Sequence, residues 1–330
     1  MSRLEIVAEI SANHLGSLER ALKIVEAAAE AGATHVKLQT WSPDTMCIDR
    51  GYTLRHGPWA GRTLFDLYRE AWTPWEWHKP IFDYARILGL VPFSAAFDRE
   101  SVDFLETLGV DRHKVASFEL VDLPLIRYMA SKGKPMILST GMASFDEYIA
   151  AFEAAAEAHS HLTFLQCTSA YPADAQDANL ETMLDLMGYG TLGIDCGLSD
   201  HTQGIGVACA AAALGATMIE KHLTLARSDG GPDAGFSMEP AEFKQMVVEC
   251  RRAALARGRV HYGPGPKEST DLRRSLWITR DVAPGEPLRL GFNVATARPA
   301  LGLSPATDLE GAIARRYLPA GMPLTQEMLA

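Results

Sequence analysis

The stretch LEIVAEISANHLGSLERALKIVEAAAEAGATHVKLQT (4–40) has the pattern of a strand, a helix and a second strand. LEIVAEI (4–10) and HVKLQT (35–40) are short, largely apolar runs, typical of buried parallel strands. Between them, residues 17–31 are rich in Ala, Glu and Leu and are followed by Gly32, a residue that commonly ends helices. The stretch therefore predicts one strand–helix–strand unit.

The same pattern recurs through most of the chain. The further strand-like runs are LVPFS (90–94), KVASF (114–118), PMILST (135–140), LTFLQC (162–167), LGIDCGLS (192–199) and TMIEKH (217–222). The helix-like segments are 17–31, 74–88, 98–108, 122–132, 145–158, 178–188, 203–214 and 239–256. Eight such pairs predict an α/β fold of the (β/α)8 TIM barrel type. A doubly wound sheet also alternates this way, but the count of eight and the absence of a GxGxxG turn after the first strand favour the barrel.

The sequence changes character after the eighth helix. Residues 259–275 are polar and contain Gly and Pro, so they predict a linker. Residues 276–330 contain short strand-like pieces and predict a small second domain. We therefore expect a barrel domain at 1–258, a linker at 259–275 and a small domain at 276–330.

The connection after the second strand, residues 41–73, is too long for an ordinary turn and is rich in aromatic residues. Long loops of this kind commonly carry function. Its tryptophan cluster includes Trp59 and Trp72, with Trp75 and Trp77 just beyond. We interpret this cluster as packing for the loop, with stacking on a sugar as the alternative.

Composition narrows the class of protein. The chain has 330 residues and a net charge of −10, which argues against a general nucleic-acid binder. We find no apolar run of the roughly 20 residues that a bilayer requires, and no signal-peptide pattern at the first residues. The five cysteines are scattered, without CxxC spacing, and predict reduced thiols in a cytoplasmic protein.

Polar residues gather at the C-terminal ends of the predicted strands, where a TIM barrel forms its active site. These residues are Glu9, Lys37, Gln39, Ser94, Lys114, Ser117, Glu119, Ser139, Gln166, Ser169, Tyr171, Ser199, Asp200, His201, Glu220, Lys221 and His222. Two lysines and several hydroxyls suit the phosphate and carboxylate of a small anion. Lys37 also has a plainer interpretation, pairing with a neighbouring acid, and Glu220 is equally well explained as a salt-bridge partner of Lys37 or Lys114.

Two histidines, His201 and His222, end adjacent predicted strands, so their imidazoles can meet at one divalent cation. Two His ligands with carboxylate and water oxygens suit Mn²⁺ or Mg²⁺ better than a closed zinc site. Each histidine taken singly is also explained as a hydrogen-bonded structural residue. Acidic side chains complete the metal shell or act as general acid and base; the candidates are Glu9, Glu119, Glu220 and Asp233.

Several ordered motifs resemble the N-acetylneuraminate (sialic acid) synthase family. They are AEISANHLGS (8–17), VKLQT (36–40), KPMILSTGMAS (134–144), QCTSAYPA (166–173), GLSDHTQGI (197–205) and GPDAGFSMEP (231–240). RRSLWITRDVAPGEPL (273–288) and ARPALGLSP (297–305) resemble the antifreeze-like (SAF) domain of that family. The resemblance covers nearly the whole chain and implies a TIM barrel followed by a SAF domain.

Within the family, TLFDLYREAWTPWEWHKP (63–80) resembles the pseudaminic acid synthase branch. That branch implies a transferase that condenses phosphoenolpyruvate with 2,4-diacetamido-2,4,6-trideoxy-L-altrose, giving pseudaminic acid and phosphate. Acceptors of the neuraminate or legionaminate branches remain alternatives. Two rivals from other classes are an aldolase with a Schiff base on Lys37, Lys114 or Lys221, and a non-catalytic sugar-binding protein.

The resemblance also implies roles for individual residues. The metal, Mn²⁺ with Mg²⁺ or Co²⁺ as alternatives, falls to His201 and His222. The phosphoenolpyruvate site falls to Lys37, Gln39, Ser94, Lys114, Ser117, Ser139 and Ser199. Glu9 and Glu119 are placed near the attacked carbons, while Ser169, Tyr171 and Asp233 face the acceptor sugar.

The resemblance further implies a domain-swapped homodimer in which Arg298 enters the neighbouring protomer's barrel; an ordinary surface salt bridge is the alternative for this residue. The chain departs from the family pattern at Ala95 and Ala96, where relatives carry Ser or Thr and Pro. One hydroxyl on the phosphate side is therefore missing. Ser169 replaces the Asn of neuraminate enzymes and suggests a different contact with the acceptor.

Overall fold

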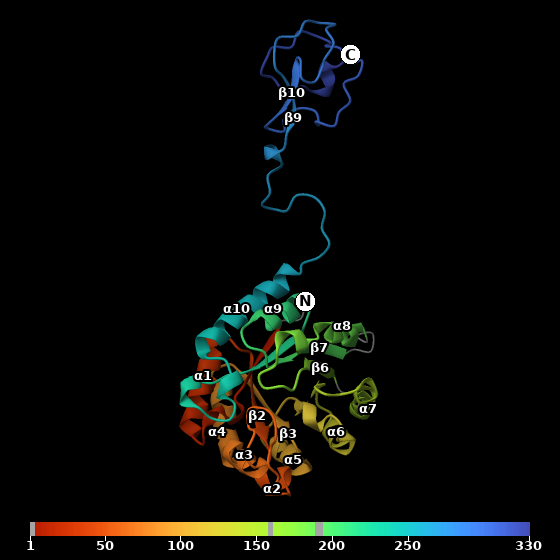
Figure 1. The fold of residues 1–330 in the computed structure, drawn as a ribbon. Helices are drawn as coiled ribbons and strands as arrows, with labels where there is room; N and C mark the ends of the chain where they lie inside the picture. Colours follow the sequence, from red (N-terminus) through yellow and green to blue (C-terminus); the bar gives the residue numbers. More distant parts are fainter. Residues whose placement is uncertain (1–3, 158–160, 189–193) are drawn as a thin grey trace. The chain divides into compact units, whose positions relative to one another are not determined.

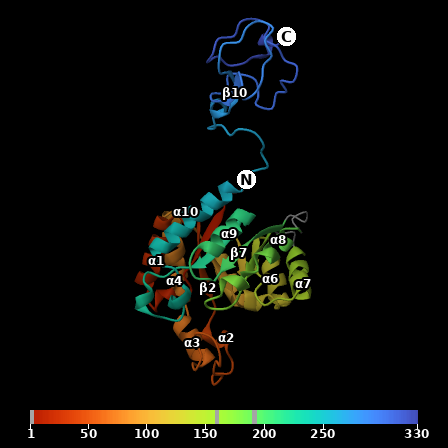
Figure 2. The same ribbon diagram turned by 45° about the horizontal axis from the view of Figure 1, so that its top comes forward.

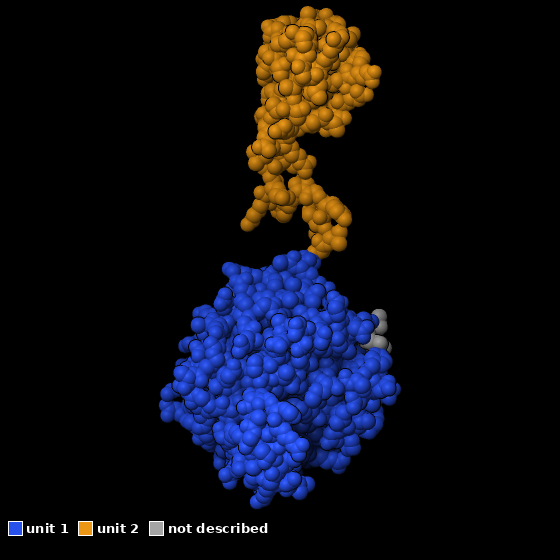
Figure 3. All heavy atoms as spheres, viewed as in Figure 1, with its two compact units in different colours: residues 1–258 blue, residues 259–330 orange. Residues whose placement is uncertain are grey.

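The computed structural model describes residues 4–157, 161–188 and 194–330. Residue 158 of the helix predicted at 145–158, and residues 192 and 193 of the strand predicted at 192–199, lie outside these ranges. The chain divides into two compact units, residues 1–258 and residues 259–330 (Figure 3).

Eight parallel strands close into a barrel in the first unit. β1 (Glu5–Glu9) pairs with both β2 (His35–Thr40) and β8 (Met218–His222), and this double pairing closes the ring. The other strands are β3 (Val91–Ala96), β4 (His113–Val115), β5 (Met136–Ser139), β6 (Leu162–Cys167) and β7 (Ile194–Asp200). The predicted TIM barrel is confirmed.

Helices connect the strands and surround the barrel (Figure 1). They are α1 (Leu18–Ala31), α4 (Trp75–Ile87), α5 (Arg99–Thr107), α6 (Leu123–Ala130), α7 (Phe145–Ala156), α8 (Leu180–Gly188), α9 (Gly206–Leu214) and α10 (Pro240–Ala256). The Ser17 hydroxyl caps α1 by accepting a hydrogen bond from the Arg20 amide. Gly32 ends it with a φ of 89°, a left-handed conformation that glycine adopts without strain. Each of the eight predicted helices is present.

The barrel interior changes from apolar to polar along its axis. Its apolar part is a cluster formed by Val7, Phe93, Ile137, Leu165 and Met218. Side chains alternate across a strand, so the residue two positions further on faces the same interior. Those next inward positions are Glu9, Ala95, Ser139, Cys167 and Glu220. The apolar cluster therefore closes the barrel beneath a polar layer at the C-terminal strand ends.

The strand predicted at 114–118 is shorter than expected. β4 ends at Val115, and Ser117–Glu119 forms a short 3₁₀ helix (η2). The Ser117 hydroxyl accepts a hydrogen bond from the Gly141 amide at 3.1 Å, which ties this turn to the segment after β5. The prediction of a strand over residues 116–118 is wrong because the apolar run does not reveal this turn.

The long connection after β2 contains two helices, α2 (Pro43–Met46) and α3 (Leu64–Ala71). Both stand out from the strands of the barrel in Figure 2. Trp75, at the start of α4, stacks on Phe104 with ring centroids 4.7 Å apart, and its indole N–H donates to the Trp41 carbonyl. Trp75 therefore packs as predicted, whereas Trp59 has different neighbours, described below.

The second unit has its own small core around an antiparallel pair of strands, β9 (Ser275–Ile278) and β10 (Val294–Ala297). Arg298 follows β10 directly and is exposed. In the described parts of both units, no helix combines the length and apolar character needed to cross a membrane.

Candidate active site

Charged side chains are buried inside the barrel above its apolar cluster. Glu9 is 0% exposed, Lys37 4% and Lys114 1%. Isolated charges at this depth would destabilise the fold strongly, so each needs a partner within the protein or on a ligand. The contacts of each charge therefore indicate where a ligand belongs.

Lys37 has protein partners. Its Nζ lies 2.6 Å from Glu9 Oε2 and 3.5 Å from Glu220 Oε1. Burial by itself would lower the pKa of Lys37. Glu220 and Glu9 raise the pKa by more than burial lowers it, so it lies above the usual lysine value. Lys37 is therefore a charged ammonium paired with two carboxylates. This matches the salt-bridge interpretation of Glu220, one of the alternatives that the sequence left open. Gln39 joins this group by donating to Glu9 Oε1 at 3.1 Å.

Lys114 has no such partner. Its ammonium donates to the Ser139 hydroxyl and to the Val115 carbonyl, and no carboxylate forms an ion pair with it among the residues described. Burial lowers its pKa below the ordinary lysine value. A buried cation without a counter-ion, beside a hydroxyl, is suited to bind an anionic ligand.

The hydroxyls of Ser117 and Ser169 converge on Gly141. A Cβ at Gly141 would lie 2.2 Å from Ser169 Oγ and 2.7 Å from Ser117 Oγ. Only glycine leaves room for this close approach. The strand-end hydroxyls are therefore gathered beside Ser139 on β5.

His201 and His222 lie together, with ring centroids 5.4 Å apart. His201 Nδ1 is 3.0 Å from the Thr168 carbonyl, so Nδ1 carries a proton, and in the neutral ring Nε2 keeps its lone pair. His222 Nδ1 is buried and has no hydrogen-bond partner in the described structure. Burial, together with nearby His201, holds the pKa of His222 well below its usual value, which keeps the imidazole neutral.

These two imidazoles fit a divalent metal. A neutral ring with an unpartnered buried nitrogen can serve as a metal ligand, and the Thr168 hydrogen bond orients the other ring. No group of three or more His, Cys, Asp or Glu side chains is already gathered as a ligand set in the described ranges. Two imidazoles leave coordination positions of a divalent metal that water or substrate oxygens can fill.

Glu119, at the end of the 3₁₀ helix after β4, is a separate acid. Its Oε2 is buried and makes no hydrogen bond to the residues described. Burial raises the pKa of Glu119 to about 7, above the usual glutamate value of 4.5. A carboxyl that titrates near neutrality is suited to take up and return a proton.

We expect Glu119→Gln to change how stability depends on pH. The pKa of Glu119 is about 7 in the folded protein and 4.5 in the unfolded chain. The proton on Glu119 therefore contributes its full stabilisation of the fold below pH 4.5, and this contribution is lost as the pH rises through 7. Between these pH values the wild type should lose up to about 3 kcal/mol of its free energy of unfolding. Glu119→Gln should not show this loss, because its amide cannot ionise. Urea unfolding at pH 4.5 and pH 8 measures the difference. Glu26→Gln, a change in an exposed residue, should behave as wild type. If the free energy of unfolding changes equally between pH 4.5 and pH 8 in all three proteins, Glu119 is not an acid with a raised pKa.

Aromatic rings line the histidines. The Tyr171 ring lies 4.4 Å from that of His201, and the Phe236 ring lies 5.0 Å from that of His222. Asp233, on the same connection as Phe236, accepts a hydrogen bond from the Ala12 amide at 3.2 Å. Burial raises the pKa of this carboxyl. The surroundings of the histidines are therefore part aromatic and part acidic.

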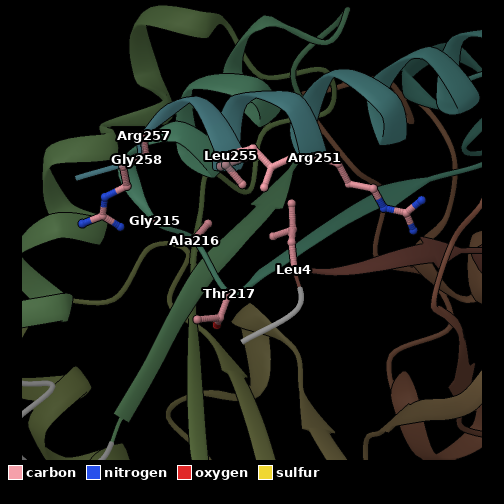
Figure 4. Close-up of a pocket in the computed structure, with 10 residues that line it drawn as sticks. Leu4, Gly215, Ala216, Thr217, Arg251, Leu255, Arg257 and Gly258 are labelled. Atoms are coloured by element: carbon pink, nitrogen blue, oxygen red, sulfur yellow. The ribbon is translucent and has the colours of Figure 1, made fainter. Parts of the chain in front are cut away.

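Two large cavities lie at opposite ends of the barrel. One of about 640 Å³, at the C-terminal ends of β5 and β6, is lined by Thr140, Cys167 and Ser169. Another of about 680 Å³ lies where β1 and β8 begin, and Figure 4 shows Arg251 and Leu255 of α10, and Arg257 just after that helix, beside it. We assign the chemistry to the C-terminal end of the barrel, where Ser169 lines the first cavity, although Lys114, His201 and His222 line neither cavity.

Family models match most of the chain. The NeuB family matches residues 24–262, and the SAF domain matches residues 273–330. The chain belongs to the NeuB family. The predicted family, and the predicted order of a barrel followed by a SAF domain, are thereby confirmed.

Relatives of this NeuB chain include named synthases. A pseudaminic acid synthase of Campylobacter jejuni subsp. jejuni serotype O:23/36 (strain 81-176) is 39% identical over 306 residues, covering 91% of this chain and 88% of the relative. An N,N'-diacetyllegionaminic acid synthase of Legionella pneumophila is 34% identical over 340 residues, covering 98% and 93%. The structure of an N-acetylneuraminic acid synthetase from Leptospira borgpetersenii aligns with a TM-score of 0.73 at 28% identity, covering 80% of this chain and 88% of that one. The prediction of a synthase is confirmed.

The NeuB barrel gathers most of the predicted site residues, but not Ser94. Phe93 faces the interior, so Ser94 faces the opposite side of β3. There its hydroxyl lies 2.6 Å from Thr40 Oγ1, which in turn contacts His78 of α4. The structure therefore corrects the placement of Ser94 in the anion site. The inward position next to it is Ala95, which pairs with Lys114 and offers no hydroxyl.

Sequence reasoning missed Phe236 as part of the site and gave Lys221 the wrong surroundings. Phe236 lies within the motif GPDAGFSMEP, and its aromatic ring was the available signal. Lys221 does not face the barrel interior, because Glu220 and His222 on either side of it do. It forms an ion pair of 2.6 Å with Asp200 instead.

Proposed function

We propose that this NeuB-family enzyme is a pseudaminic acid synthase. It condenses phosphoenolpyruvate with 2,4-diacetamido-2,4,6-trideoxy-L-altrose and releases pseudaminic acid and phosphate. The observation that carries this proposal is the buried Lys114 without a counter-ion, at the same end of the barrel as two buried imidazoles. The higher identity to a pseudaminic acid synthase than to a legionaminic acid synthase supports the choice of acceptor.

The anion site is formed by Lys114 with hydroxyls around it. Lys114 neutralises the phosphate of phosphoenolpyruvate, and the hydroxyls of Ser117 and Ser139 donate to its oxygens. The Ser199 hydroxyl, which donates to Glu220 Oε1 at 3.1 Å in this structure, turns to the phosphate when the ligand binds. Lys37 faces the same interior, and Glu9 and Glu220 keep it charged and oriented. Gln39 fixes Glu9 through its amide.

His201 and His222 would hold the divalent metal, for which we favour Mn²⁺ over Mg²⁺ or Co²⁺. When bound, the metal supplies Lewis-acid polarisation of the acceptor's aldehyde oxygen. Tyr171 and Asp233 beside the histidines orient the acceptor, and Ser169 contacts it from the end of β6. These side chains place the aldehyde carbon against carbon 3 of phosphoenolpyruvate.

The bonds then change in three steps. Carbon 3 of phosphoenolpyruvate forms the new C–C bond to the aldehyde carbon, whose oxygen receives the electron pair and then a proton from solvent. Water adds to the cation at carbon 2, and Glu119, with a pKa of about 7, accepts its proton. The tetrahedral intermediate then expels phosphate by C–O cleavage, and Lys114 stabilises the leaving charge.

Phosphate release tests this function. The enzyme with Mn²⁺ and phosphoenolpyruvate is offered the altrose sugar, N-acetylmannosamine and the legionaminate precursor in parallel. Release with the altrose sugar alone is expected. Release with another acceptor would move the chain to that branch, and no release would overturn the synthase reaction and favour a sugar-binding role.

A Schiff-base aldolase is a second candidate, because the lowered pKa of Lys114 also suits an amine nucleophile. Lys221 is unsuited to that role because its ammonium is held by Asp200. An aldolase needs no metal, so EDTA would leave its activity unchanged. The synthase should lose phosphate release in EDTA and regain it with Mn²⁺.

We further propose that two copies of the chain form a domain-swapped homodimer, with Arg298 of one copy completing the barrel site of the other. Two inactive variants, Arg298→Ala and His222→Ala, should then restore activity when mixed and allowed to exchange subunits. In a mixed dimer one site has both residues, so about one quarter of wild-type activity is expected. If each site uses its own Arg298, or if Arg298→Ala alone is fully active, the mixture will show no such gain.

We also place the reaction in the cytoplasm. All five cysteines are free thiols, and the Sγ atoms of partly buried Cys209 and buried Cys250 lie 4.0 Å apart without forming a disulfide. Unpaired thiols at this distance are typical of a reducing compartment.

A further inference from the structure

Three aromatic rings from different connections meet beside the histidines. Tyr171 follows β6, Phe236 follows β8, and Trp59 lies in the long connection after β2. The Trp59 ring is 5.4 Å from that of Tyr171 and 6.2 Å from that of Phe236. The three rings form one continuous apolar surface, which we call the aromatic wall.

Trp59 is held in place through its polar atom. Its indole N–H donates to the Pro232 carbonyl at 2.8 Å, on the same connection as Phe236. The bond satisfies the one hydrogen-bonding group of the side chain, so what the indole presents to a ligand is apolar ring surface. Trp59 and Tyr171 are only partly buried, so this surface is open to a ligand.

The rings lie in order outward from the histidines. Tyr171 contacts His201, and Phe236 contacts His222. Trp59 packs in turn against Tyr171 and Phe236. An open-chain six-carbon sugar spans roughly 6 Å from first to last carbon, since a C–C bond is about 1.5 Å. With its aldehyde at the histidines, its last carbon reaches the part of the wall that Trp59 contributes.

We propose that Trp59 determines acceptor specificity by receiving the terminal methyl group of a 6-deoxy sugar. This inference rests on the proposed function, because it takes an open-chain amino-sugar aldehyde as the acceptor. Aromatic surface buries a methyl group favourably. It offers no partner to a hydroxyl, whose desolvation without a hydrogen bond is unfavourable. An apolar site of this kind discriminates against an added hydroxyl by up to about 100-fold.

The test uses two acceptors that differ only at carbon 6: the 2,4-diacetamido-2,4,6-trideoxy-L-altrose and its 6-hydroxy counterpart. Wild-type enzyme should prefer the methyl sugar in kcat/KM by about 10- to 100-fold. Trp59→Ala should reduce this preference to near unity, while Trp59→Phe keeps most of it. Trp75→Phe, a change in a tryptophan that stacks on Phe104, serves as the control and should retain the wild-type ratio.

The outcomes separate this inference from the proposed function. If Trp59→Ala keeps the wild-type preference for the methyl sugar in kcat/KM, Trp59 does not determine specificity, although the synthase function stands. If wild type releases no phosphate with either sugar, the proposed function fails, and saturation-transfer NMR then compares binding of the two sugars. A saturation-transfer signal from the sugar's methyl group that is present in wild type and lost in Trp59→Ala still supports a methyl site at Trp59. Equal methyl signals in the two proteins, or no binding by either, would overturn it.

Discussion

His222→Ala should lower the rate of phosphate release by at least about 1,000-fold, because His222 brings a buried nitrogen that no described residue uses. Polarisation of a carbonyl by a bound metal is worth several kcal/mol, and about 4 kcal/mol corresponds to a factor of 1,000 in rate. The variant should also bind Mn²⁺ more weakly in a calorimetric titration without substrates. His201→Ala should have the same two effects.

The control is His261→Ala, since His261 is exposed and lies outside the barrel unit. It should release phosphate and bind Mn²⁺ as wild type does. Thermal unfolding of all three variants checks that the barrel is intact. Wild-type Mn²⁺ affinity in both His201→Ala and His222→Ala would remove these histidines from the metal site, whatever happens to the rate.

The sequence was sufficient for the fold and for the placement of several charged residues inside the barrel. The repeated strand and helix patterns predict the barrel because each buried parallel strand is a short apolar run bounded by a helix. The rule that barrel chemistry lies at C-terminal strand ends then places Lys37, Lys114, His201 and His222 together. The structure confirms that His201 and His222 are neighbours and that Lys37 and Lys114 are buried.

The sequence could not tell which side of a strand faces the interior. A strand buried on both faces carries apolar residues at every position, so its pattern has no alternation to read. LVPFS therefore gave no means of seeing that Phe93 faces inward and Ser94 outward. Trp59 is a different case, because its contact with Tyr171 joins residues far apart in sequence, which no local pattern reveals.

Asp200→Ala should reduce the free energy of unfolding by about 3–5 kcal/mol, because it leaves a buried ammonium without its partner. Asp200 Oδ2 lies 2.6 Å from Lys221 Nζ, and each side chain is 1% exposed. Lys221 keeps a hydrogen bond to the Thr202 carbonyl, which does not compensate a full charge. Urea unfolding of the full chain measures the loss.

An exposed ion pair on the same barrel provides the matched control. Lys79 and Asp83 on α4 also lie 2.6 Å apart, but their side chains are 71% and 47% exposed. Exposed pairs contribute about 0–1 kcal/mol, so Asp83→Ala should change stability little. Equal losses for Asp200→Ala and Asp83→Ala would mean that burial does not set the strength of the Asp200–Lys221 pair.

The double variant Asp200→Leu/Lys221→Met separates stability from positioning. Replacing both charges with apolar side chains removes the unpaired ion, so stability should return to within about 1–2 kcal/mol of wild type. Asp200 and Lys221 directly precede His201 and His222, and their ion pair joins β7 to β8 next to both histidines. The double variant should therefore fold yet bind Mn²⁺ about 10- to 100-fold more weakly, the loss typical when supporting contacts of metal ligands are removed. Restored stability with wild-type Mn²⁺ affinity would limit the pair to a structural role.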